Sequence, residues 1–199
     1  MVPRLLRSLM LVAVLALGLA PAAFAHDDAA APASASIRSE FHTMLTDAEK
    51  KLIELAEATP PGKFAWSPGK GVRSTSEVFM HVAAANYLIP TFVGHAATPG
   101  VDPMKLESDI KEKDSAVKTL RESFASAHAA IEKTTDLDTK IKMFGMDVTK
   151  RYALLLLVTH AHEHLGQAIA YARTNDVTPP WTARAEAASA AKKAEADKK

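Results

Sequence analysis

Apolar residues recur every three or four positions along four segments of the chain, the spacing that places them on one face of an α-helix. The four segments cover about residues 36–58, 74–90, 115–133 and 148–173. No segment alternates apolar and polar residues over the roughly four to eight positions that indicate a β-strand. The pattern therefore predicts an all-α protein, and four helices of this length are typical of a four-helix bundle.

Each of these helices is predicted to turn one apolar stripe toward the core. The first helix ends before the Pro-Pro-Gly segment at 60–62, which cannot continue it. Ser74 and Glu77 are spaced as a capping box that begins the second helix, and Pro90 is expected to kink or end it. The stripes comprise Ile37, Phe41, Met44, Leu45, Leu52 and Leu55, then Val78, His81, Val82, Ala85 and Ile89, then Val117, Leu120, Phe124, Ala127 and Ile131.

The connections between the helices predict the topology. About 20 residues join the second helix to the third, enough for a long crossover that makes these two helices parallel, with room for a short extra helix. The bundle domain is predicted to cover residues 36–182. A flexible segment rich in Ala, Pro and Ser, 26–35, precedes it, and a charged tail rich in Ala and Lys, 183–199, follows it in solvent.

The first 25 residues have the organisation of a secretory signal peptide, and we assign residues 1–25 to one. Arg4 and Arg7 precede an apolar segment at 9–19, and the Ala-Phe-Ala sequence at 23–25 is a small-x-small cleavage site. The apolar segment is shorter than the roughly 18 residues of a transmembrane helix. We therefore expect a protein that is exported to the bacterial periplasm and is not inserted in the membrane after cleavage.

Charge and cysteine content exclude several functions. Loss of Arg4 and Arg7 with the signal peptide changes the formal net charge from +1 to −1. A nearly neutral chain gives no electrostatic basis for binding nucleic acid. The sequence contains no cysteine, which excludes disulfides, thiolate zinc sites, iron–sulfur clusters and a cysteine nucleophile. Core packing, a metal ion or oligomerisation must therefore stabilise the fold.

The candidate chemistry lies in the fourth helix, in the sequence Thr-His-Ala-His-Glu-His-Leu-Gly-Gln at 159–167. His160 and His164 are four residues apart, so they share one helix face and can chelate one transition metal ion. His162 points about 200° away from His160. The third ligand must come from another helix, and His81 is the best candidate because it lies in the apolar stripe of the second helix. A buried imidazole needs a polar partner, which a metal ion can provide.

Three neutral imidazoles suit a divalent transition metal ion, zinc or nickel above all, and leave a coordination position for water or substrate. Gln167 lies on the same side of the helix as His164 and is a candidate to orient a ligand. Glu163 is a candidate general base, because residues 160–164 fit the H-x-x-E-H pattern of one protease class. That class needs a further acidic ligand well downstream, and the 35 residues after His164 are mostly tail. Gly166 is expected to allow another backbone close to the helix. The alternative is that the histidines only form hydrogen bonds in the core.

Several motifs, taken together in their order, resemble those of DinB-like proteins. The sequences at 164–167 (His-Leu-Gly-Gln) and 171–180, which begins with Tyr-Ala-Arg and ends with Pro-Pro, are similar to the C-terminal signature of that family. Trp-Ser-Pro at 66–68 and Ser-Glu-Val-Phe-Met-His at 76–81 are similar to its first-ligand region, and residues 118–124 to its third helix. The likeness covers about residues 37–181.

The resemblance implies a four-helix bundle with a metal site at His81, His160 and His164, and a homodimer. Characterised members include transferases and isomerases that use cytosolic thiols such as bacillithiol or mycothiol, and this chain departs from them in its export signal. We therefore expect an exported metal-binding DinB-like protein that acts on a small molecule as a metal-dependent hydrolase or transferase. The alternative is a non-catalytic periplasmic metal-binding or stress-associated bundle.

Overall fold

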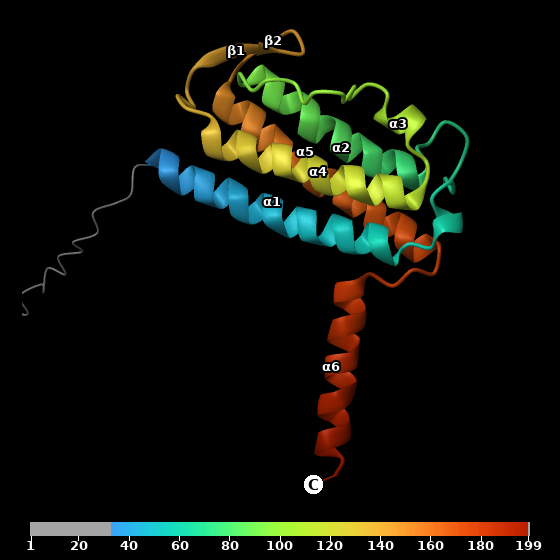
Figure 1. Cartoon of the computed structure of the whole chain (residues 1–199). Coiled ribbons are helices and arrows are strands. Elements are labelled where there is room, and N and C mark those ends of the chain that lie inside the picture. Colours follow the sequence, from blue (N-terminus) through green and yellow to red (C-terminus); the bar gives the residue numbers. More distant parts are fainter. Residues whose placement is uncertain (1–32, 199) are drawn as a thin grey trace, which may run out of the picture. The chain divides into compact units, whose positions relative to one another are not determined.

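The computed structural model describes the backbone of residues 33–198 and the side chains of residues 36–198. The predicted signal peptide, 1–25, and residues 26–32 of the predicted flexible segment lie outside the described residues. The described chain is mostly helical (Figure 1). Its long helices are α1 (Ala33–Ala58), α2 (Thr75–Phe92), α4 (Lys113–Lys133), α5 (Lys150–Thr174) and α6 (Pro180–Ala196), and its short elements are the 3-10 helix η1 (Pro61–Lys63), α3 (Leu106–Asp109), β1 (Lys140–Met143) and β2 (Met146–Thr149).

Helices α1, α2, α4 and α5 form the predicted four-helix bundle, in which α1 and α2 each pack against both α4 and α5 (Figure 1). Two contacts show that α2 and α4 are parallel. Asn86 donates a hydrogen bond of 3.1 Å to Ser123, and beyond the ends of both helices His95 lies 3.2 Å from the Thr134 hydroxyl. The long crossover between them, which contains α3, therefore has the topology predicted from its length.

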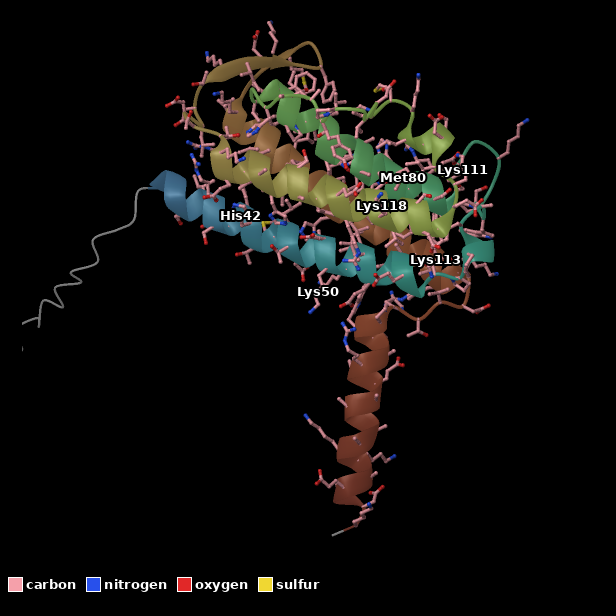
Figure 2. The ribbon with its side chains drawn as sticks, viewed as in Figure 1. His42, Lys50, Met80, Lys111, Lys113 and Lys118 are labelled. Carbon is pink, nitrogen blue, oxygen red and sulfur yellow. The ribbon has the colours of Figure 1, made fainter. Side chains whose placement is uncertain are left out.

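Polar contacts along the border between α1 and α4 fix the opposite directions of these two helices. Lys113, the first residue of α4, donates to the carbonyl oxygen of Glu57 near the end of α1. His42, in the first half of α1, contacts His128 in the second half of α4, with 3.0 Å between the two Nδ1 atoms. Figure 2 shows His42 and Lys113 toward opposite ends of this border. The start of one helix therefore lies beside the end of the other.

The predicted stripes form the core of the bundle. Full burial of each large apolar side chain stabilises the fold by about 1.5–3 kcal/mol. Met44, which was predicted to face inward, is 42% exposed, because the neighbouring Leu45 occupies the core position at this turn of α1. The fully buried side chains include Leu45, Leu52, Leu55, Phe64, Phe79, Leu120, Phe124, Ile131, Leu154 and Leu157.

The prediction that the chain has no strand was wrong for residues 140–149. β1 and β2 form an antiparallel hairpin in which Lys140 pairs with Thr149. Phe144 and Gly145 connect the strands with φ angles of 51° and 81°, and two consecutive positive φ angles are characteristic of a type I′ turn. The Thr149 side chain then accepts the backbone N–H of Tyr152 and caps α5. The hairpin thus sets where α5 begins.

Both ends of the described chain are more helical than predicted. α1 begins at Ala33, so residues 33–35 of the predicted flexible segment are helical. Most of the predicted tail, 183–199, lies in α6, which contains no buried residue and contacts α1 through a 2.8 Å pair between Arg184 and Glu54. Among the helices of the described residues, none has the length and apolar content required to cross a membrane.

Candidate metal centre

His81 on α2 lies beside His160 and His164 on α5. The two helices pack antiparallel, since the segment just before α2 contacts Tyr171 near the end of α5. This packing places the three histidines at the same level of the bundle. One ring nitrogen from each histidine lies within 4.8 Å of the other two. The ring centroids are 4.9 Å apart for His81 and His160, 4.7 Å for His81 and His164, and 4.4 Å for the pair on α5. The structure thus brings the three predicted residues into one cluster.

Glu107 of α3 orients the ring of His81. Because a carboxylate oxygen only accepts, His81 donates its Nδ1–H to Glu107 Oε1 over 2.6 Å. Burial lowers the pKa of His81, although the hydrogen bond to Glu107 acts in the opposite direction. The ring is therefore neutral at pH 7, and its Nε2 lone pair is free. Metal-ligating histidines in proteins are commonly supported by a carboxylate in this way.

A chain of three hydrogen bonds orients His164. It ends at the backbone carbonyl oxygen of Arg73, which can only accept, so the Tyr171 hydroxyl donates to it over 3.1 Å. The hydroxyl oxygen accepts from Gln167 Nε2 over 3.0 Å, which turns the amide oxygen toward His164 Nδ1 at 2.8 Å. His164 Nδ1 must therefore be the donor, which leaves Nε2 as the ring nitrogen that can bind a metal ion.

His160 is held neutral by its surroundings. Burial is the main cause that lowers the pKa of this imidazole to about 3, and electrostatic interactions with His164, His81 and Arg73 add to the effect. A neutral ring is the form that binds a metal ion. The cluster therefore offers three imidazoles, and in His81 and His164 the hydrogen bond at Nδ1 leaves Nε2 available. This donor set fits a divalent transition metal ion.

Arg73 and Glu107 form a charged pair beside the cluster. Arg73 Nε donates to Glu107 Oε2 over 2.7 Å. Burial opposes the ionisation of Glu107, but the hydrogen bonds from Arg73 and His81 outweigh it and keep the pKa of the carboxyl below its usual value. Glu107 is thus a carboxylate at neutral pH and can hold the Nδ1–H of His81.

A cavity of about 370 Å³ opens beside the cluster. His81 and His160 line it, whereas His164 is only 8% exposed and does not. Arg73 and Glu107 also line the cavity, and both belong to the hydrogen-bonded group around His81. A small molecule in the cavity can therefore reach two of the three histidines without displacing the core.

The structure places Gln167, but not Glu163, at the cluster. Gln167 contacts His164 directly, whereas Glu163 is exposed and takes no part in the hydrogen bonds described above. His162 donates to the carbonyl oxygen of Met44 on α1 over 3.0 Å, so it points away from the other two histidines of α5. The predicted close approach at Gly166 was wrong, because a Cβ built there meets no atom within 4 Å.

Sequence reasoning missed Glu107 and Arg73. Both residues lie in connections that have no helical periodicity, and the crossover contains several other acidic residues. No spacing relative to the histidines distinguishes Glu107 from Asp102, Asp109 or Glu112. Only the packing of α3 against α2 brings the Glu107 carboxylate to His81.

Together, the fold and the cluster define a helical-bundle protein in which three histidines from two helices meet beside a cavity. The model of the DinB family matches residues 33–196. This match extends over most of the chain, so the protein belongs to the DinB family.

Solved structures agree with the family assignment. A DinB-like protein from Bacillus cereus ATCC 10987 superposes with a TM-score of 0.62 at 16% identity and covers 71% of this chain and 95% of its own. A DinB-like protein from Bacillus subtilis has a TM-score of 0.54 at 25% identity and covers 72% of this chain and 93% of its own. The search of curated proteins gives no match. The predicted DinB-like bundle is thus confirmed as fold and family.

Proposed function

We propose that the protein binds a divalent transition metal ion, zinc or nickel, through His81, His160 and His164. We further propose that it acts on a small molecule as a metal-dependent hydrolase or transferase. The observation that carries this proposal is the position of the cluster, since two of its histidines line a cavity of about 370 Å³. Three protein ligands with an open side are typical of catalytic metal sites, whereas structural zinc sites are usually closed by four.

The chain's own residues supply orientation and charge to this site. A bound divalent ion would act as a Lewis acid toward a substrate oxygen. Glu107 and Gln167 hold the rings of His81 and His164 so that both Nε2 atoms stay available. Arg73 places a guanidinium at the wall of the cavity, where it can bind an anionic group of a substrate.

The metal-binding half is tested by elemental analysis of protein purified without an affinity tag, because an oligohistidine tag would bind metal itself. We expect about one zinc or nickel ion per chain in the wild type, and loss of that ion in His81→Ala, His160→Ala and His164→Ala. His162→Ala is the matched control, since it removes a histidine of the same helix that points away from the cluster. Equal metal content in His164→Ala and His162→Ala would contradict the site.

The catalytic half is tested with two probes that separate the reaction classes. Hydrolysis of 4-nitrophenyl butyrate by the zinc-loaded protein, abolished by a chelator and by His160→Ala, would support a hydrolase. Transfer of glutathione to 1-chloro-2,4-dinitrobenzene with the same dependence would support a transferase. A protein that binds metal but turns over neither probe, even when loaded with zinc or nickel, would favour the non-catalytic alternative.

Export to the periplasm is also part of the proposal, and the signal-peptide pattern of residues 1–25 supports it. The full chain would be expressed in a Gram-negative host, and the N-terminus of the protein in the periplasmic fraction would be sequenced. A mature chain that begins at His26 is the expected result. A chain found only in the cytoplasm that retains Arg4 and Arg7 would contradict export.

A further inference from the structure

The cavity beside the histidine cluster is apolar along most of its length. On α2, Ala84, Ala85 and Leu88 follow His81 at three, four and seven positions, so all four side chains lie on one helix face. On α5, Leu156 lies one turn before His160 and on the same face. An apolar groove about 10 Å long therefore extends from the histidines between the two helices.

Two exposed apolar side chains stand at the walls of this groove. Met104 of the crossover is 79% exposed, and Phe144 at the tip of the hairpin is 57% exposed. Phe144 meets Phe92 edge to face, with 4.9 Å between the ring centroids. Apolar side chains that are exposed together beside a cavity often mark a ligand-binding site in soluble proteins. A ligand with an apolar part would cover both.

The charges at the cavity limit the kind of ligand. Among the described residues that line it, only Arg73 and Glu107 carry a charge, and they pair with each other. Imidazole ligands carry no negative charge, so they would leave both positive charges of a bound divalent ion uncompensated. A ligand with one anionic head group is therefore favoured at the histidine end, whereas a sugar or a nucleotide would find no polar partners along the rest of the groove.

We propose that the cavity binds a small amphiphilic monoanion, with its metal-coordinating head at His81 and His160 and its apolar tail between α2 and α5. The head group rests on the function proposed above, but the tail site does not need the metal. The cavity volume of about 370 Å³ corresponds to about a dozen water molecules at about 30 Å³ each, and hence to about as many non-hydrogen atoms of a ligand. After the four atoms of a hydroxamate head, this leaves room for a tail of about seven or eight carbons.

The test measures how affinity depends on tail length while the head group stays constant. Acetohydroxamate, butanohydroxamate and octanohydroxamate are titrated into the zinc-loaded full chain by isothermal titration calorimetry. We expect affinity to rise about two- to fourfold per methylene, so that octanohydroxamate binds at least about 50-fold more tightly than acetohydroxamate. Equal affinity for all three would overturn the tail site and leave the metal site intact.

Variants locate the tail. Ala85→Leu adds three carbons to the groove, so the advantage of octanohydroxamate is expected to fall tenfold or more while acetohydroxamate binds within twofold of the wild type. Ala170→Leu makes the same change on an exposed face of α5 and should alter neither affinity. Phe144→Ser removes an apolar side chain that the tail is proposed to contact. Because Phe144 lies at an exposed hairpin tip, this change does not disturb the core. If octanohydroxamate keeps its full affinity advantage over acetohydroxamate in both Ala85→Leu and Phe144→Ser, the tail does not lie between α2 and α5.

A separate arm distinguishes failure of the tail site from failure of the metal site. If elemental analysis and titration show that no zinc binds, the proposed function fails, and the tail site is tested with 1-octanol on the metal-free chain. We expect shifts of the backbone amide NMR signals of Ala84 and Ala85 that saturate with 1-octanol and are absent in Phe144→Ser. Unchanged amide signals in the wild type would overturn the apolar site as well.

Discussion

At the scale of single residues, the hydrogen-bond partners of the histidines matter more than the histidines' own spacing. His160 and His164 could be found from an interval of four residues. The direction of each ring nitrogen depends instead on Glu107 and on the chain from Gln167 through Tyr171 to the Arg73 carbonyl. A side chain that fixes a metal ligand in this way commonly contributes about 10- to 100-fold to metal affinity.

Gln167→Leu should therefore weaken zinc binding by about 10- to 100-fold, because His164 loses the acceptor that holds its Nδ1–H. Tyr171→Phe breaks the same chain one step further from the metal and should cause a smaller loss. Both affinities can be measured by competition with a chromophoric chelator. Wild-type affinity in Gln167→Leu would show that the amide does not position the ring.

Gly166→Ala should stabilise the protein. Gly166 is an exposed residue inside α5, and a Cβ there meets no atom within 4 Å. Alanine favours the helix over glycine by about 0.5–1 kcal/mol. Urea denaturation should show this increase in the free energy of unfolding, with unchanged zinc affinity. A destabilised variant would mean that the position contacts something in solution, such as a second copy of the chain.

At the scale of helices and strands, the periodicity of apolar residues predicted the long helices but not the short strands. The bundle helices span enough turns for an apolar stripe to stand out, and His81 was found because it interrupts such a stripe. The hairpin strands contain four residues each, too few for an alternation to be recognised. Glu107 could not be predicted, because its position follows from the packing of α3 on α2 rather than from any local pattern.

The start of α2 gives a prediction with a pH dependence. Glu77 completes the capping box with Ser74, and the hydrogen bond from Lys111 is the largest of the causes that lower its pKa from 4.5 to about 2. A carboxyl whose pKa is lower in the folded state stabilises the fold above pH 4.5. This stabilisation is lost as the pH falls through the interval from 4.5 to about 2.

Glu77→Gln should keep the capping hydrogen bond and remove the charge. Because the side chain is partly exposed to solvent, we expect a loss of only about 0.5–1 kcal/mol at pH 7. The difference from the wild type should shrink at pH 3, as measured by urea denaturation at both pH values. Glu186→Gln on the exposed helix α6 is the control and should have no effect. A difference that is constant with pH would contradict the role of the charge.

At the scale of the whole molecule, metal binding at the cluster would be coupled to folding, because the cluster exists only when α2 and α5 are packed together. Zinc at 100 times its dissociation constant should stabilise the folded chain by about 2.7 kcal/mol. For a chain of this size, that raises Tm by about 5–10 °C. Calorimetry should show this increase in the wild type and in His162→Ala, but not in His164→Ala. An equal increase in all three proteins would place the bound ion elsewhere.

His81 and His160 stand at the two ends of a long stretch of chain that contains most of α2, the crossover, all of α4 and the hairpin. A metal ion bound by both histidines would close this stretch into a ring, as a disulfide does in many secreted proteins. No sulfur takes part in such a ring, so thiol oxidants and disulfide reductants would leave it closed. When the metal is scarce, the ring would open. The stability of the folded protein would therefore depend on metal supply rather than on redox conditions.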